Sequence, residues 1–335
     1  MTMSDDESFI RAVVDGRGDD TPRLVYADWL DDRSDPRGPY LRAELAWVKS
    51  GKGEKKLRSL AVGLNKVWLA RVTRPPLGVC CDAIVIRNSR PHTTAAELDA
   101  VDAKLGLKLP AEHRALLLNH NGGALAFGQP PDSEDGRHAF SEVDGFIGVA
   151  SAAERAKGGW VWDVAEAGKM VQTPRRNGAS TLSDYVPLTQ TETDDMYLVG
   201  VRGKVTGHVV FFNDCTHEPW DPGHLDPVAK SLGALLWSII ETTPQWYKLI
   251  RNGDRAGLKA WLDAGGDPNA EHPHQNREDT TPLVAAILMT DSAMVRELVS
   301  RGAKKTPEVK RVALFLKGSA GKAVKAALAA KGRKK

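Results

Sequence analysis

Residues 105–123 read LGLKLPAEHRALLLNHNGG, and this stretch defines one helix with both of its ends. Pro110 starts the helix, because the fixed φ angle of proline suits the first helical turn. The run AEHRALLLNH continues the helix. Asn121, Gly122 and Gly123 end it, since an asparagine followed by two glycines permits the left-handed backbone of a helix C-cap.

A second helix is predicted just upstream. Thr94 and Glu97 fit a capping box, in which two side chains satisfy backbone N–H groups at the start of a helix. Apolar residues then recur on one face, and the pattern ends at Gly106. The residues of this face are Leu98, Val101 and Leu105.

Short apolar stretches further along indicate strands. They cover residues 184–188, 196–201 and 205–213, and the last of them contains GHVVFFN. Arg202 and Gly203 fit a hairpin turn between the second and third stretches. We therefore expect an antiparallel sheet here.

A closing helix is predicted after the strands, with Asp226 as its N-cap and Pro227 in its first turn. Its apolar stripe comprises Val228, Leu232, Leu235, Leu236 and Ile239. Helices thus flank an antiparallel sheet, and residues 92–242 are predicted to form an α+β domain.

Three segments of this domain resemble the SUKH superfamily (Smi/Knr type): residues 105–123, residues 207–220 (GHVVFFNDCTHEPW) and residues 226–240 (DPVAKSLGALLWSII). The first is similar to the signature in which Leu-Pro precedes a helix that ends in Asn-Gly-Gly. Ala115 departs from the pattern, because members usually place an aromatic residue before the leucine of that helix. The resemblance implies a non-enzymatic binding domain. Many bacterial members serve as immunity proteins that neutralise a cognate toxin by direct contact.

Residues 1–90 carry patterns that predict a small helical region. Ser4 and Glu7 fit a capping box, and Thr21 and Pro22 open a second helix. Apolar residues continue at helical spacing, and the last pattern predicts one further helix. Its apolar positions are Leu57, Leu60, Ala61, Leu64 and Trp68.

The run DDTPRLVYADWLDDRSDPRGPYLRAEL, residues 19–45, resembles the repeat-companion domain, a bacterial module found beside repeat domains. That family has no assigned activity, so the resemblance implies an architecture and no reaction. Asp28, Asp31 and Asp32 are of a residue type that binds metals, but no His or Cys stands nearby to complete a site. We expect a helix face that carries these carboxylates to solvent.

Two stretches near the C-terminus, residues 253–270 and 281–304, can be overlaid with an offset of 37 residues. The matched pairs are Asp254 with Asp291, Leu258 with Val295, Leu262 with Val299 and Gly265 with Gly302. The pattern resembles the ankyrin repeat, which has a period of about 33 residues and a Thr-Pro-Leu start. We expect an all-α ankyrin-like segment over residues 244–335, in which residues 306–328 form a degenerate capping pair.

The length of 335 residues allows two or three domains, and the predicted boundaries are 1–90, 92–242 and 244–335. The net charge of +3 hides a segregation: residues 91–240 hold twenty Asp or Glu against twelve Lys or Arg, whereas residues 303–335 hold eleven Lys or Arg against Glu308 alone. The acidic middle favours a basic protein partner and repels nucleic acid. A solvated, frayed end is the favoured interpretation of the basic tail, and binding of polyanions there is the alternative.

Candidate partner-binding residues lie in or beside predicted loops. They are Asp194, Asp195, Asp221, Trp160, Trp162, Trp220, His272 and His274. An exposed indole gives much contact area at little entropic cost, and adjacent carboxylates suit a basic partner. The alternatives stay open: tryptophans that pack over the sheet, solvated acids, and histidines that are incidental to a loop.

No catalytic site, metal site or cofactor is expected. Asp214, Cys215 and His217 have the residue types of a catalytic triad, but alternate positions along a strand point to opposite faces. His272 and His274 carry metal-compatible atoms, yet Pro273 holds their rings apart. Common phosphate, dinucleotide, zinc-protease and hydrolase signatures are missing. The three cysteines include an adjacent pair, so buried free thiols are the simplest interpretation.

No stretch approaches the roughly 18 apolar residues that cross a bilayer, and the N-terminus MTMSDDESF is acidic, unlike a secretory signal. We therefore expect a cytoplasmic protein without a membrane partner. The sequence does not determine its oligomeric state. The leading hypothesis is an immunity protein whose acidic loops contact a basic toxin. A scaffold or regulatory adaptor unrelated to toxins is the second, and an enzyme that uses Cys215 and His217 is the third.

Overall fold

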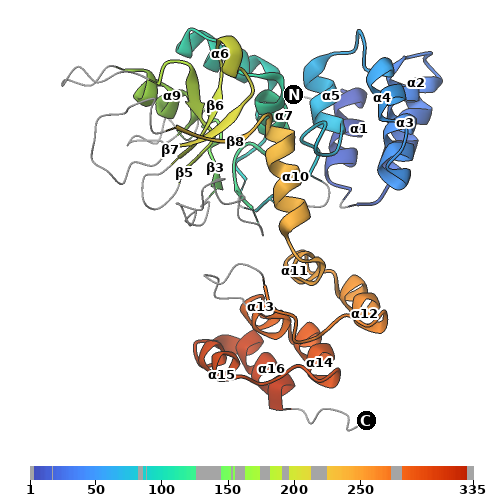
Figure 1. Ribbon diagram of the computed structural model, residues 1–335, viewed down its shortest axis with the longest axis vertical. Helices are drawn as coiled ribbons and strands as arrows, with labels where there is room; N and C mark the ends of the chain where they lie inside the picture. Colours follow the sequence, from blue (N-terminus) through green and yellow to red (C-terminus); the bar gives the residue numbers. More distant parts are fainter. Residues whose placement is uncertain are drawn as a thin grey trace. The chain divides into compact units, whose positions relative to one another are not determined.

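The computed structural model forms two compact units, Met1–Ile240 and Glu241–Lys335 (Figure 1). It describes residues 4–16, 18–81, 86–87, 89–125, 145–151, 154, 163–173, 182–190, 196–212, 225–272 and 281–329. The segments predicted as an N-terminal domain and a middle domain lie in the same unit. None of the helices in these ranges combines the length and apolar character that a membrane span needs.

The first 72 residues supply the helices α1 (Asp5–Val14), α2 (Thr21–Asp31), α3 (Arg37–Ser50), α4 (Glu54–Leu60) and α5 (Lys66–Val72). The predicted cap of α1 is confirmed, because the Ser4 side chain accepts a hydrogen bond from the Glu7 N–H at 3.2 Å. The single helix predicted across residues 57–68 is wrong. Asn65 caps a new helix there by accepting hydrogen bonds from the N–H groups of Val67 and Trp68.

The RLVYADWL motif supplies a buried ion pair. Arg23 and Glu44 are 1% and 0% exposed, and their charged groups lie 3.5 Å apart. Arg74 adds a second cation at 3.2 Å from Glu44 and donates its backbone N–H to the same carboxylate. Buried charges are tolerated only when they are paired and hydrogen-bonded, so this cluster fixes how α2, α3 and the end of α5 meet.

The same motif supplies a buried hydroxyl. The Tyr26 hydroxyl donates to Asp6 at 2.7 Å and accepts from Trp68 Nε1 at 3.0 Å and from Arg37 at 3.2 Å. Four helices therefore meet at one side chain. The carboxylates of Asp28 and Asp31 pair with Arg42 on the exposed face of α2.

The second part of the first unit is an α+β layer, as predicted. Its helices are α6 (Ala95–Leu105), α7 (Ala111–His120), α9 (Val164–Gln172) and α10 (Leu232–Thr242). The strands β4 (Tyr185–Pro187), β6 (Met196–Gly200), β7 (Val209–Phe212) and β8 (Leu225–Ala229) form an antiparallel sheet in the order β4-β6-β7-β8. Smaller pairs join β1 (Ile86–Arg87) to β2 (Ala124–Leu125) and β3 (Gly145–Phe146) to β5 (Thr189–Gln190). Apolar residues of α6, α7 and α9 share one core cluster with Val186 and Val199 of the sheet.

The predicted starts and stops of α6 and α7 are confirmed. Thr94 and Glu97 form a reciprocal capping box. The turn after α7 has positive φ angles at Asn121, Gly122 and Gly123. A Cβ on Gly122 would lie 2.8 Å from the Gly148 backbone nitrogen, so the second residue of Asn-Gly-Gly must be glycine for close approach as well as for its φ.

The prediction that the closing helix begins at Asp226 is wrong. Asp226 and Pro227 belong to β8, where they pair with Phe211 and Val210 of β7. Proline lacks an N–H donor but is tolerated there because β8 is an edge strand. The helix α10 begins at Leu232, since its first N–H groups are satisfied by other side chains. Gly233 donates to Glu112 at 2.9 Å, and Ala234 donates to Ser231 at 3.1 Å.

The third strand is also shorter than predicted. Residues 205–208 do not belong to it, because Gly203–Val205 form a 3-10 turn, η1, and β7 starts at Val209. The Gly207 N–H donates to the Gly200 carbonyl at 2.8 Å and closes the connection between β6 and β7.

The helical region and the α+β layer are joined inside the first unit. The Arg71 guanidinium donates to the Asn119 side-chain oxygen at 3.0 Å, and the Asn119 amide returns a hydrogen bond to the Arg71 carbonyl at 3.0 Å. Arg71 also forms a bidentate pair with Glu7 at 2.7 and 2.8 Å. A Cβ on Gly233 would lie 2.7 Å from the carbonyl oxygens of Pro76 and Gly78. The two regions therefore pack as one body.

The second unit is all-helical in the ranges described. Its helices are α11 (Gln245–Arg251), α12 (Arg255–Asp263), α13 (Pro282–Leu288), α14 (Ser292–Ser300), α15 (Pro307–Leu314) and α16 (Gly318–Ala329). Asp254 and Asp291, which the 37-residue offset aligns, are the N-caps of α12 and α14. Gly265 and Gly302, aligned by the same offset, both have a φ of 94°. The ankyrin assignment itself stays a prediction.

The buried ion pair gives a test of stability. Glu44→Ala leaves Arg23 buried without its anion, and we expect it to lower the free energy of unfolding by roughly 3–5 kcal/mol in urea denaturation. Glu54→Ala is the matched control, because Glu54 pairs with Arg58 on the surface and such pairs contribute about 0.5 kcal/mol or less. Equal losses in the two variants would contradict the role of the buried cluster.

His113 gives a test of pH dependence. Its ring is 1% exposed, and in the part of the chain that the structure describes neither ring nitrogen has a hydrogen-bond partner. Burial lowers the pKa of His113 to about 4. Between pH 6.5 and 4 the unfolded chain therefore binds a proton that the folded chain excludes, so stability falls as the pH falls through this window.

We expect His113→Phe to raise stability at neutral pH by about 1–3 kcal/mol and to flatten the decline below pH 6.5. His120, whose pKa burial also lowers to about 4, and His92, whose pKa burial lowers too, contribute to the residual slope. His208→Phe is the control, because His208 is exposed. Denaturation curves at several pH values measure both effects, and an unchanged slope in His113→Phe would refute the assignment.

Candidate functional site

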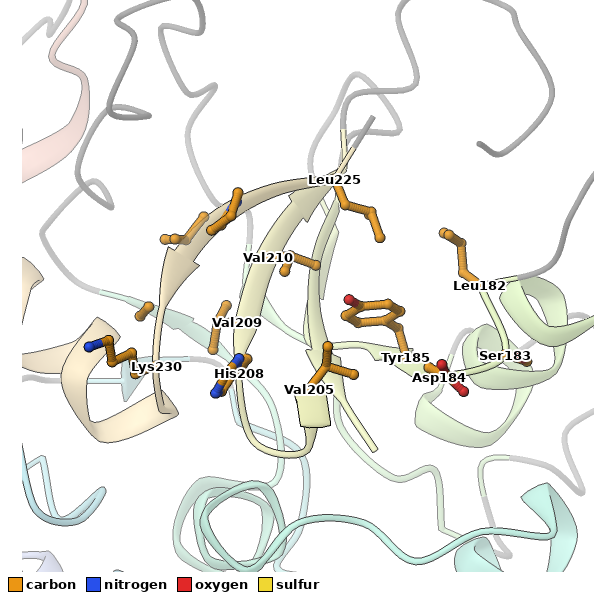
Figure 2. A pocket seen from close by; sticks show the side chains of 13 residues that line it. Leu182, Ser183, Asp184, Tyr185, Val205, His208, Val209, Val210, Leu225 and Lys230 are labelled. Atoms are coloured by element: carbon orange, nitrogen blue, oxygen red, sulfur yellow. The ribbon is translucent and has the colours of Figure 1, made fainter. Parts of the chain in front are cut away.

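A hollow of about 710 Å³ opens over the four-stranded sheet of the first unit (Figure 2). It lies between the turn that precedes β4 and the edge strand β8. Its walls come from four places: residues 182–185, Val205 of η1, residues 208–210, and Leu225 with residues 227–230. Segments far apart in the sequence therefore build one concave surface, as is usual for binding sites.

Gly200 shapes this hollow. It is the last residue of β6, and a Cβ there would lie 1.9 Å from the Val205 carbonyl oxygen. The absent side chain lets η1 fold back over the end of the strand. The Gly200 N–H donates to the His208 carbonyl at 2.9 Å and so places His208 and Val205 together on the wall.

The inner wall is apolar. Leu182 and Val210 are 1% and 6% exposed, and they share a core cluster with the partly buried Tyr185 and Leu225. Figure 2 shows the side chains of these four residues around one space. The partly buried Tyr185 and Leu225 leave apolar area open to a bound group, from β4 and from β8.

The rim is polar and carries both signs of charge. Asp184, His208 and Lys230 are exposed on the wall of the hollow. Burial, together with the charge of Asp184, raises the pKa of Tyr185, so its hydroxyl keeps its proton at neutral pH and can donate a hydrogen bond. The hollow thus combines apolar contact area with a few directional polar groups, which is the composition of a recognition site.

The structure describes His272 among the eight residues predicted to bind a partner. Its side chain is 5% exposed, and its ring lies 4.8 Å from that of Tyr247 and 6.0 Å from that of Trp246. Its role in binding stays a prediction. The other seven lie outside the described residues, as do Cys215 and His217. The seven predicted partner-binding residues outside the described ranges are Asp194, Asp195, Asp221, Trp160, Trp162, Trp220 and His274.

Sequence reasoning missed the residues of the hollow. The sequence pattern puts Lys230 inside the closing helix and His208 inside a strand, so it does not predict that they line one hollow with Tyr185. One signal was present: the strand MYLVG ends in glycine just before a turn that contains two further glycines. A glycine inside a strand pattern often marks the close approach of another backbone.

A second concave surface of about 650 Å³ lies between the helical region and α10. Trp47 and Val48 of α3 line it together with Trp237 and Ile240 of α10. Val48 and Trp237 are 44% and 41% exposed. This apolar surface exists only because the two regions of the first unit pack together.

Comparison with known families assigns the middle of the chain. Residues 92–237 match the model of the SMI1 / KNR4 family (SUKH-1). This match supports a SUKH domain in this segment. The match runs from the residues before α6 into α10, so it includes the whole sheet and every wall of the hollow in Figure 2. No curated protein and no solved structure matches the chain.

The shape of the hollow gives a prediction. Gly200→Ala puts a methyl group against the Val205 carbonyl, and we expect a loss of roughly 2 kcal/mol or more, because the backbone of η1 must move. Lys204→Ala is the control in the same connection, since Lys204 is exposed and such substitutions stay within about 0.5 kcal/mol. Thermal unfolding compares them, and equal midpoints would show that the turn does not depend on this close approach.

Proposed function

We propose that this protein is a non-enzymatic binding protein whose SUKH domain acts as an immunity protein, neutralising a cognate toxin by direct contact. The family match over residues 92–237 carries the proposal, because SUKH domains are known as immunity proteins. An immunity protein that acts by direct contact binds the toxin and blocks its activity. It does not have to catalyse a reaction.

The described surface supports binding. The hollow of Figure 2 offers an apolar interior and an exposed rim, and its walls come from short strands and turns. A preformed surface binds with less loss of conformational entropy than a surface that must order itself. We propose that Asp184, Tyr185 and Lys230 contact the toxin together with the predicted acidic residues Asp194, Asp195 and Asp221.

The charge of this domain favours a basic toxin. Residues 91–240 hold twenty Asp or Glu against twelve Lys or Arg, a net charge of −8. Such a surface accelerates encounters with a cationic protein and repels nucleic acid. The proposed contact is therefore strongest at low ionic strength.

The flanking regions have supporting roles in this proposal. Residues 19–45 resemble the repeat-companion domain, and the buried residues of this run have structural roles. Arg23, Tyr26 and Glu44 all contribute to the internal packing. The ankyrin-like segment is proposed to extend or regulate the interface. The shared N-caps and glycines of its two aligned stretches favour that assignment.

A cytoplasmic scaffold or regulatory adaptor is the second candidate. The apolar surface around Trp47 and Trp237 favours it, because that surface involves the helical region and extends beyond the sheet. The third candidate, an enzyme that uses Cys215 and His217, predicts an activity that Cys215→Ala abolishes while the fold is retained. We propose that no such activity exists.

The first experiment separates these functions. The tagged full chain is used to isolate partners from its native host at roughly 50 mM and roughly 500 mM salt. The recovered protein is then expressed alone and together with this chain in a second host. Growth arrest by the partner alone, relieved by co-expression, supports immunity. A partner that is harmless by itself favours the scaffold.

A charge reversal tests the surface. With the recovered partner, we expect Asp184→Lys to weaken binding by roughly tenfold, because the rim of the hollow loses an anion that faces a cationic protein. Asp32→Lys is the matched control, since Asp32 is an exposed acid at the end of α2 in the helical region. Isothermal titration measures both dissociation constants. Equal affinities would remove the hollow from the proposed interface.

A further inference from the structure

Two adjacent apolar side chains protrude from the second unit. Leu314 and Phe315, at the end of α15, are 76% and 71% exposed. The buried apolar side chains of this helix pair are those of Val309, Val312, Val324 and Ala327. Leu314 and Phe315 therefore add little to the core of the unit, although a Leu or Phe side chain gains about 1.5–3 kcal/mol when it leaves water.

Cationic side chains surround this pair. Lys310 and Arg311 lie one helical turn before it, and Lys317 follows two residues after Phe315. Lys325 of α16 approaches the same turn, because its ammonium group donates to the Leu316 carbonyl at 3.1 Å. The wider segment, residues 303–335, has a net charge of +10. We call Lys310, Arg311, Leu314, Phe315, Lys317 and Lys325 the basic tip.

We propose that the basic tip docks on the surface of an anionic lipid bilayer. Protruding Leu and Phe side chains can enter the boundary between headgroups and acyl chains, while lysines around them attract anionic headgroups. A nucleic acid would neutralise the same lysines but leave Leu314 in water. Such docking needs no membrane-spanning helix. The proposal therefore revises the expectation that the protein has no membrane partner, which rested on the absence of a spanning segment.

The proposal is independent of immunity by the SUKH domain, because it concerns another unit and another class of partner. It would place the toxin-binding surface near a membrane without changing what that surface binds.

Co-sedimentation with vesicles tests the proposal. The full chain is mixed with vesicles of phosphatidylcholine alone and with vesicles in which about a third of the lipid is phosphatidylglycerol. We expect binding to the anionic vesicles only, weakened at high salt. Leu314→Ser/Phe315→Ser should weaken it by roughly tenfold, since insertion is lost. Lys310→Gln/Lys317→Gln should also weaken it by roughly tenfold or more, because each lysine near the surface contributes about 1 kcal/mol.

Matched variants control for general effects. Val25→Ser removes a 49% exposed apolar side chain from α2, which carries several acids, and should leave binding unchanged. Lys169→Gln/Lys204→Gln removes two exposed lysines of the first unit and should have little effect. Circular dichroism checks that every variant is folded.

Three outcomes would overturn the proposal: no binding to anionic vesicles, equal binding to neutral vesicles, or anionic binding that Leu314→Ser/Phe315→Ser leaves intact. The last would indicate general attraction to polyanions. A single-stranded oligonucleotide that binds this variant as tightly as the parent and displaces the vesicles would assign the basic tip to nucleic acid instead. Binding of toxin is measured without vesicles, so the two proposals fail separately.

Discussion

The C-terminal end of α7 holds the first unit together, because two asparagine side chains there satisfy backbone groups from three other segments. Asn119 exchanges hydrogen bonds with Arg71 of α5. Asn121 accepts from the Val149 N–H at 2.7 Å and donates to the carbonyl oxygens of Pro91 and Val149. Buried amides of this kind contribute modest net stability when they are satisfied and cost much when they are not, so they select one arrangement of the chain. The loop fixed by Asn121 continues through Ile147, whose N–H donates to Leu188 beside β4 at 3.0 Å. The helical region and the sheet are thus both positioned from one helix end.

The most distinctive residues of the helical region make their contacts within that region. Arg23, Tyr26 and Glu44 are at most 1% exposed, and their polar atoms meet groups from the same region. A buried ion pair is weak evidence for stability, since an apolar cluster of equal volume often does as well. Its effect is instead to penalise every packing in which one charge loses its partner. Arg71 of the same region also hydrogen-bonds to Asn119 of the SUKH domain. The buried contacts of these helices therefore help to position the residues around Trp47 and Trp237.

Local signals predicted local structure well. The capping box at Thr94 and the Asn-Gly-Gly turn fix helix ends by contacts within a few residues, and such contacts can be read from sequence. The start of α10 could not be read in this way. Asp226 and Pro227 look like a helix start, but pairing with β7 recruits them into a strand, and Glu112, more than one hundred residues away, caps the helix at Gly233. The hollow was missed for the same reason. Tyr185, His208 and Lys230 line one hollow only because β7 pairs with β8 and because η1 folds back over Gly200.

The separation of charge along the chain suggests two surfaces with different partners. A net charge of −8 over residues 91–240 and of +10 over residues 303–335 could have cancelled within one domain, yet the family match confines the SUKH domain to residues 92–237. An acidic surface repels anionic lipids and nucleic acids, and the partner proposed for the SUKH domain is therefore a cationic protein. The basic tip has the opposite requirement. Because each surface repels the partner of the other, both can act on one chain without competing for the same ligand. This charge separation fits the two proposals, toxin binding at the sheet and membrane docking at the C-terminal helices.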